Sequence, residues 1–249
     1  MMRAVVLQHL DGEGPGLLGD FLREYEIAYD CVMLNRGETI PLDAGHDLML
    51  VMGASQQVWQ EDKFPWLKEE KRAIRQWVED LGKPYFGVCF GHQLLAEVMG
   101  GAAGPAEHDE LGLIKVTATQ AAAKDDVFSV FPETSRWVQW HTAEVTAPPK
   151  GASVLAKSAN CAVQAMSLGT SAVSIQFHAE ATVERVDSWL TMRECIEDME
   201  KMRGEGAHER FIADARKYLP EANHNSRKLF TRFLEINGLI PAERTQAAE

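Results

Sequence analysis

A cysteine flanked by glycines is the residue of this chain best suited to chemistry. Cys89 ends an apolar run, PYFGV, and stands two residues from Gly87 on one side and from Gly91 on the other. A nucleophile on a tight strand-to-helix turn is crowded by its neighbours, and glycine at both flanking positions relieves the crowding. The N-terminal dipole of the helix that follows favours thiolate over thiol. Core packing is the usual role of a cysteine, but this spacing favours a reactive thiol.

A histidine and a glutamate far downstream supply the other groups that a thiol hydrolase needs. His178 and Glu180 lie two residues apart in the segment QFHAE. In an extended segment, residues i and i+2 face the same side. The imidazole can abstract and return protons, while the carboxylate fixes its tautomer and supports its cation. The pattern predicts a Cys-His-Glu triad.

The elements that must position these residues follow an alternating pattern in the first hundred residues. Short continuous apolar runs at 3–8, 29–34, 47–52 and 84–89 read as strands, and the segments at 17–25, 65–81 and 92–99 read as helices. Such alternation is typical of βαβ units, and continuous apolar runs indicate strands that are buried on both faces. We therefore expect an α/β fold, with an open, mostly parallel twisted sheet and helices on both faces.

The rest of the chain predicts an extension of this sheet and a helical end. Short strand-like segments at 112–119, 136–141, 153–157, 162–167 and 172–177 indicate antiparallel strands and hairpins. Apolar spacing predicts helices at about 182–203, 207–218 and 223–237. We expect a single domain at 1–240, made of an α/β core (1–181) with the C-terminal helices (182–240) packed on it, and a tail at 241–249.

Ligands of open α/β sheets bind beyond the carboxyl ends of the strands, where the predicted fold would gather the site. Gly53 and Ala54 follow the third predicted strand, Cys89 follows the next, and His178 follows the last. The backbone N–H of Phe90 would point towards an oxyanion formed at the target of the sulfur, and Ala54 could supply a second N–H. His9, near a Gly-Pro-Gly turn, could line this site or serve as a structural hydrogen-bond partner.

Composition excludes several classes of function. The net charge of −12 and the lack of a basic stripe argue against nucleic-acid binding, and no run approaches the length of a membrane span. Four scattered cysteines form no metal-type spacing and fit a reducing, cytoplasmic setting. No metal or organic cofactor is indicated.

Three motifs in order resemble a known family. GVCFGHQLLAEVMGG is similar to the G-x-C-x-G-x-Q motif of class I (triad) glutamine amidotransferases, and QFHAE is similar to their closing Q-F-H-x-E. VMGASQQV resembles a segment of stand-alone members close to the glutamine domain of GMP synthase. The resemblance covers about residues 3–180 and implies the flavodoxin-like fold of that family.

The resemblance also implies an activity. Cys89 would attack the γ-carboxamide of glutamine, His178 would pass the proton to departing ammonia, and Glu180 would orient His178. Water would then release glutamate from the γ-glutamyl thioester. The family ordinarily passes the ammonia to a synthase partner or domain, so the resemblance implies a small-molecule substrate and leaves open a separate synthase subunit or a homodimer.

Further site residues come from the same resemblance. Phe90 and Ala54 would form the oxyanion hole, and Gln93, Gly53 and His141 would contact the substrate.

Two departures from the family pattern keep alternatives open. The chain has Gly53-Ala54-Ser55 where relatives have Gly-Gly-Pro, and His141-Thr142-Ala143 where they have His-Gly-Asp. The alternatives are a hydrolase of another γ-glutamyl amide or peptide, or a non-catalytic amidotransferase-like binding protein. A thiol hydrolase of the intracellular-protease type is less attractive, because those enzymes place a histidine directly after the cysteine and here the nearest is His92.

Overall fold

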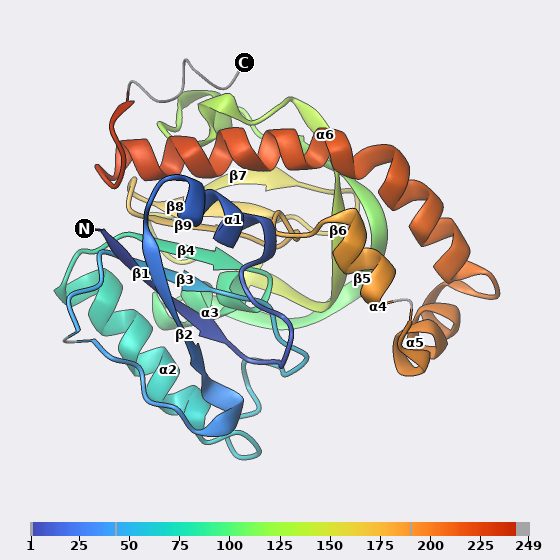
Figure 1. Ribbon diagram of the computed structural model, residues 1–249, viewed down its shortest axis with the longest axis horizontal. Coiled ribbons are helices and arrows are strands. Elements are labelled where there is room, and N and C mark those ends of the chain that lie inside the picture. Colours follow the sequence, from blue (N-terminus) through green and yellow to red (C-terminus); the bar gives the residue numbers. More distant parts are fainter. Residues whose placement is uncertain (1, 43, 190, 243–249) are drawn as a thin grey trace.

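A nine-stranded sheet forms the centre of the molecule (Figure 1). The computed structural model describes residues 2–42, 44–189 and 191–242, so most of the predicted tail at 241–249 lies outside the described residues. In chain order the strands are β1 (Arg3–Gln8), β2 (Ala28–Met33), β3 (Leu48–Val51), β4 (Tyr85–Val88), β5 (Ala102–Ala118), β6 (Thr134–Ala147), β7 (Ser153–Lys157), β8 (Ala165–Leu168) and β9 (Ala172–Ile175).

The sheet has a parallel half and an antiparallel half. Its order is β2-β1-β3-β4-β9-β8-β7-β5-β6. Neighbouring strands from β2 to β9 run parallel, and those from β9 to β6 run antiparallel. The predicted α/β fold with an antiparallel extension is confirmed. The grouping of β9 with the antiparallel strands was only half right, because this strand pairs parallel with β4 on one edge and antiparallel with β8 on the other.

Helices cover both faces of the sheet (Figure 1). One apolar cluster joins side chains of α1 and α6 to alternate residues of the central strands, and a second joins α2 and α3 to the residues between them. This alternation is the period-two geometry of a strand that is buried on both sides. The helices are α1 (Gly16–Glu24), α2 (Trp66–Arg75), which continues in a π-helical turn (Gln76–Asp80), α3 (Phe90–Val98), α4 (Val183–Trp189), α5 (Arg193–Arg203) and α6 (Ala207–Ile236).

The structure departs from the sequence-based boundaries in two regions. The β5–β6 hairpin is much longer than the short strands predicted there, and its pairing shifts register between Pro105 and Glu110. The separate helices predicted at 207–218 and 223–237 are one continuous helix, α6, with Pro220 inside it. Proline removes one helical hydrogen bond, but the burial of large side chains of α6, such as Phe230 and Phe233, outweighs that loss.

The predicted helix at 182–203 is divided into α4 and α5. The subdivision of the domain at 181/182 stays a prediction. Within the described part of the chain, no helix combines the length and the apolar character needed to cross a membrane.

Candidate active site

Cys89 occupies a strained turn between β4 and α3. Its backbone has φ +52° and ψ −98°, a positive-φ conformation that costs free energy for a residue with a side chain. The flanking glycines permit it. A Cβ on Gly87 would lie 2.8 Å from the Gly91 carbonyl oxygen, and a Cβ on Gly91 would overlap the carbonyl oxygen of Val51 on the neighbouring strand. The crowding predicted from the G-x-C-x-G spacing is therefore present in the structure.

The pairing of β4 with β9 brings His178 to this turn. The Cys89 N–H donates to the Ile175 carbonyl at 2.8 Å, directly beyond the last paired residues of the two strands. The His178 side chain is hydrogen-bonded to the Cys89 side chain. Gly53 lies against both of them, since a Cβ built there would be 3.3 Å from His178 Cε1 and 3.7 Å from Cys89 Cβ.

Glu180 completes the hydrogen-bonded series. His178 Nδ1 donates to Glu180 Oε1 at 2.6 Å, which leaves Nε2 for the bond with Cys89. Burial disfavours the imidazolium, but the negative charges of Glu180 and Cys89 outweigh burial and raise the pKa of His178 well above its usual range. The site thus favours a protonated imidazole between two anions. Trp189, on α4, packs edge-on against the imidazole with ring centroids 6.4 Å apart.

Two backbone N–H groups border the sulfur. Phe90 is the first residue of α3, so its N–H has no acceptor within the helix. Ala54 follows β3 and lines the same cavity as Cys89. The peptide that carries the Ala54 N–H is anchored from behind by His9, whose Nδ1 donates to the Gly53 carbonyl at 3.1 Å. His9 is fully buried, and its Nε2 lies 2.8 Å from Glu70 Oε1.

A cavity of about 600 Å³ opens onto these groups. Its walls include the turn after β3, the start of α3, the middle of β6 and part of α5. Trp140 and Trp189 meet edge to face at 5.7 Å and form an aromatic side of the cavity. Acidic groups from α5, Glu194 and Asp198, also line it, whereas no lysine or arginine of the described chain does.

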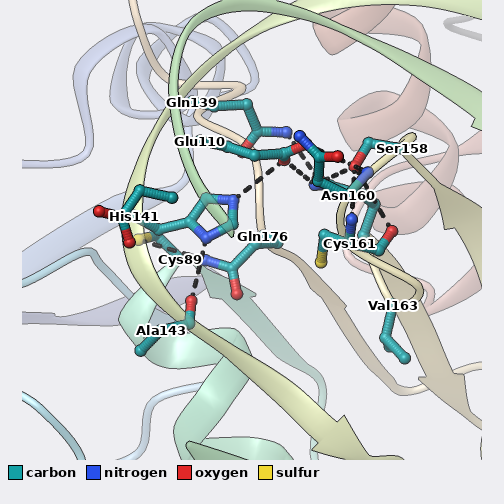
Figure 2. Close-up of polar contacts among 12 residues, drawn as sticks. Cys89, Glu110, Gln139, His141, Ala143, Ser158, Asn160, Cys161, Val163 and Gln176 are labelled. Carbon is teal, nitrogen blue, oxygen red and sulfur yellow. Dashed lines mark hydrogen bonds and ion pairs between the residues drawn. The ribbon is translucent and has the colours of Figure 1, made fainter. Parts of the chain in front are cut away.

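The side chains of Gln93 and His141 line the cavity but bond mainly to the protein. Gln93 Nε2 donates to the Ala143 carbonyl at 3.0 Å, and His141 Nδ1 donates to the same oxygen at 3.0 Å. His141 Nε2 lies 3.2 Å from the buried carboxylate of Glu110 (Figure 2). Burial raises the pKa of Glu110, but hydrogen bonds from His141, Ser158 and Gln164 outweigh burial and hold it below its usual range.

Sequence reasoning missed three groups at this site. Gln176 donates to the Cys89 sulfur, and its position two residues before His178 on an extended segment was the available signal. Glu13 accepts a hydrogen bond from Trp189 Nε1 at 2.8 Å, a contact across 176 residues that no local pattern indicates. Glu110 is a buried carboxylate inside a polar stretch that reads as exposed.

Comparisons with known proteins agree with this arrangement. The profile of the family described as class-I glutamine amidotransferase matches residues 32–197. The glutamine-hydrolysing GMP synthase subunit of Saccharolobus solfataricus is 36% identical over 105 residues, which cover 42% of this chain and 54% of that protein. The glutamine-hydrolysing GMP synthase of Aeropyrum pernix is 32% identical over 163 residues, 63% of this chain and 29% of that protein. The chain thus matches about half the length of the Saccharolobus relative.

Solved structures share the fold. A glutamine amidotransferase from Thermotoga maritima superposes with a TM-score of 0.83 at 24% identity, over 94% of this chain and 98% of that chain. A glutamine amido transferase from Methylobacillus flagellatus gives a TM-score of 0.83 at 23% identity, over 94% of this chain and 95% of that one. With the family profile matched over more than half of its length, this chain belongs to the class I glutamine amidotransferase family.

Proposed function

We propose that this chain hydrolyses the γ-amide of glutamine to glutamate and ammonia through a cysteinyl thioester. The observation that carries the proposal is the hydrogen-bonded series from Cys89 through His178 to Glu180, at the floor of a cavity. A thiolate beside an imidazolium is both a strong nucleophile and a source of the proton that the leaving amine needs. The raised pKa of His178 supports this ion-paired state.

In the first half-reaction, the Cys89 sulfur attacks the γ-carbonyl carbon of glutamine. The carbonyl oxygen becomes an oxyanion, which the N–H groups of Phe90 and Ala54 stabilise. The C–N bond then breaks, and His178 gives its proton to the nitrogen, which leaves as ammonia. Cys89 is now bound to the γ-glutamyl group as a thioester.

In the second half-reaction, neutral His178 removes a proton from a water molecule that attacks the thioester carbonyl. The C–S bond breaks, and its electron pair returns to the Cys89 sulfur. Glutamate leaves, and the thiolate–imidazolium pair is restored. Glu180 keeps the imidazole in one tautomer throughout, because its bond to Nδ1 leaves Nε2 as the nitrogen that exchanges the proton.

We further propose that a separate synthase subunit consumes the ammonia. The support is that relatives of similar sequence are themselves subunits of GMP synthases, which are named for glutamine hydrolysis. A cytoplasmic setting is part of the same proposal, and all four cysteines are free. A homodimer stays a prediction from the sequence.

The size of the cavity favours a second candidate, hydrolysis of a larger γ-glutamyl amide. A volume of about 600 Å³ falls in the range that accommodates drug-sized ligands, and glutamine would fill only part of it. The substituted segment at Thr142 and Ala143 also lines this space. A longer amide could extend from Cys89 towards Glu194 and Asp198.

A substrate panel tests both candidates. Purified chain is incubated with glutamine and with γ-glutamyl amides of increasing size, and released ammonia or amine and glutamate are measured. We expect hydrolysis by the unmodified chain and none by Cys89→Ala. Equal turnover by both chains would eliminate the thiol mechanism. A preference for the larger amides would identify the second candidate, and a folded chain that turns over nothing and is not labelled by a glutamine-like electrophile would identify a binding protein.

A further inference from the structure

A second donor meets the Cys89 sulfur from the side of β9. Gln176 follows directly after this strand, and its side chain is fully buried. Its Nε2 lies 3.5 Å from Cys89 Sγ, within hydrogen-bond distance of a sulfur acceptor (Figure 2). The sulfur therefore has two polar neighbours in the described structure, the imidazole of His178 and this amide.

The direction of the Gln176 amide is fixed by a neighbouring glutamine. The Ala143 carbonyl oxygen can only accept hydrogen bonds, so the Gln93 atom 3.0 Å from it must be the NH₂ group. The same Gln93 nitrogen lies 3.2 Å from the Gln176 side chain, which must offer its oxygen there. With Oε1 committed to Gln93, Nε2 of Gln176 is turned towards the sulfur. The reverse orientation would place two NH₂ groups face to face and an amide oxygen against the sulfur.

The anchor of this series is itself buried. Ala143 accepts a second hydrogen bond from His141, and His141 is held on its other side by Glu110 (Figure 2). Gln93 and Gln176 are at most 3% exposed, so solvent does not compete for these amides. A buried network whose members all have partners holds a single orientation.

We propose that Gln176 is a further catalytic residue, an amide donor that holds the Cys89 sulfur as thiolate, and that Gln93 is the positioning residue that aims it. This inference rests on the proposed function for its consequence in catalysis. An N–H donor bonds more strongly to an anionic sulfur than to a neutral one. The donor therefore stabilises the thiolate before attack, and it stabilises the same charge when the C–S bond of the thioester breaks and the electron pair returns to sulfur.

The pH dependence of Cys89 alkylation reads this role without requiring any turnover. Iodoacetamide reacts with the thiolate, and peptide mass spectrometry separates Cys89 from the three other cysteines. The titratable groups that share the cavity with the sulfur are Asp11, Glu13, His141, His178, Glu180, Glu194 and Asp198. Gln176→Met and Gln93→Met exchange a neutral side chain for another of similar length, so this set of charges is retained.

We expect the midpoint of the alkylation curve to rise by about one pH unit in Gln176→Met, which is a tenfold loss of thiolate at a pH below the midpoint. Gln93→Met should move the midpoint in the same direction, and the double variant should move it no further than Gln176→Met alone. Gln139→Met is the matched control. This glutamine is fully buried on β6 and donates to the side chain of Gln164, not to the sulfur or to Gln176. Its curve should match that of the unmodified chain.

Two results would overturn the proposal. One is a Gln176→Met chain with native circular dichroism whose alkylation curve superimposes on the control. The other, if Gln176→Met does not fold, is an unchanged curve for Gln93→Met. Glutamine hydrolysis by the unmodified chain is measured in parallel. If the unmodified chain hydrolyses nothing but the curves shift, the proposed function fails and the role of Gln176 stands.

Discussion

His9 donates from Nδ1 to the carbonyl oxygen of Gly53 at 3.1 Å, although 44 residues separate them in the chain. That carbonyl and the N–H of Ala54 belong to one planar trans peptide, so they point in opposite directions. Holding the oxygen away from the cavity therefore aims the N–H into it. Glu70 lies 2.8 Å from the other ring nitrogen and fixes the imidazole in a fully buried position.

We expect His9→Ala to lower kcat for glutamine hydrolysis with little change in KM. The Ala54 donor would lose its fixed direction, and removal of one oxyanion donor costs about 100-fold or more in kcat. Steady-state kinetics measures the split, and Glu70→Gln should reproduce part of the loss. The control is His108→Ala, which changes an exposed histidine on β5. A His9→Ala chain that raises KM and keeps kcat would instead place His9 in substrate binding.

The pKa of His178 predicts the effect of removing its carboxylate partner. Glu180→Gln keeps the shape of the side chain but removes a negative charge that raises the pKa of the imidazole. Neutral imidazole cannot protonate the departing ammonia. The alkaline limb of the pH profile of kcat/KM should therefore move to lower pH, and activity at neutral pH should fall by about 100-fold or more. Glutaminase assays across a pH series measure both effects, and an unmoved alkaline limb would contradict this role for Glu180.

Gly91 allows the turn at Cys89 to pack against β3. A Cβ at this position would overlap the Val51 carbonyl oxygen, and this part of the backbone is held within the sheet. Gly91→Ala should therefore lower the free energy of unfolding by about 1–3 kcal/mol and displace the turn, with loss of activity. Urea unfolding compares it with Gly104→Ala, whose added Cβ would make ordinary contact with Thr146 at 3.4 Å. Equal stability of the two variants would show that the turn can move.

Local signals were sufficient for the parts of the fold that contain the nucleophile. The strand before Cys89 is a short apolar run between a proline and a tight turn, and the helix after it ends at paired glycines, so both were predictable from neighbouring residues. The β5–β6 hairpin was not, because polar residues around Glu107 interrupt its apolar pattern where the pairing shifts register. The continuity of α6 through Pro220 depends on packing against the sheet, which no local pattern reports.

The site divides in the same way. Cys89, His178 and Glu180 were predictable because the spacing of each pattern reflects a backbone geometry that the chemistry requires. The role of His9 stayed open from the sequence, because it depends on Glu70, 61 residues further along the chain. Gln93 was predicted as a substrate contact and lines the cavity, but its amide nitrogen is engaged by Ala143 and Gln176. Substrate contact by its remaining oxygen stays a prediction.

His92 is expected to make the chain sensitive to acid. Its Nε2 donates to the Val163 carbonyl at 3.0 Å and its Nδ1 lies 2.8 Å from Ser174 Oγ, which donates to it, so the buried ring is neutral. Burial, only partly opposed by the hydrogen bond to Val163, lowers the pKa of His92 to about 3. In the unfolded chain the same imidazole takes up a proton near pH 6.5. Between these values the unfolded state binds more protons, so stability falls as the pH falls.

The expected slope is at most about 1.4 kcal/mol per pH unit for this one proton, and it should be seen between about pH 6 and pH 4. His92→Gln removes the titration and keeps an amide that can serve both partners. We expect the variant to be somewhat less stable at neutral pH and to lose less of its free energy of unfolding on acidification. Urea unfolding at a series of pH values measures the two slopes. Carboxylates with a lowered pKa, such as Glu110, remain in both chains, so both should still unfold in strong acid. Parallel slopes between pH 6 and pH 4 would mean that His92 accepts a proton in the folded state, and that the hydrogen bonds to Val163 and Ser174 rearrange when it does.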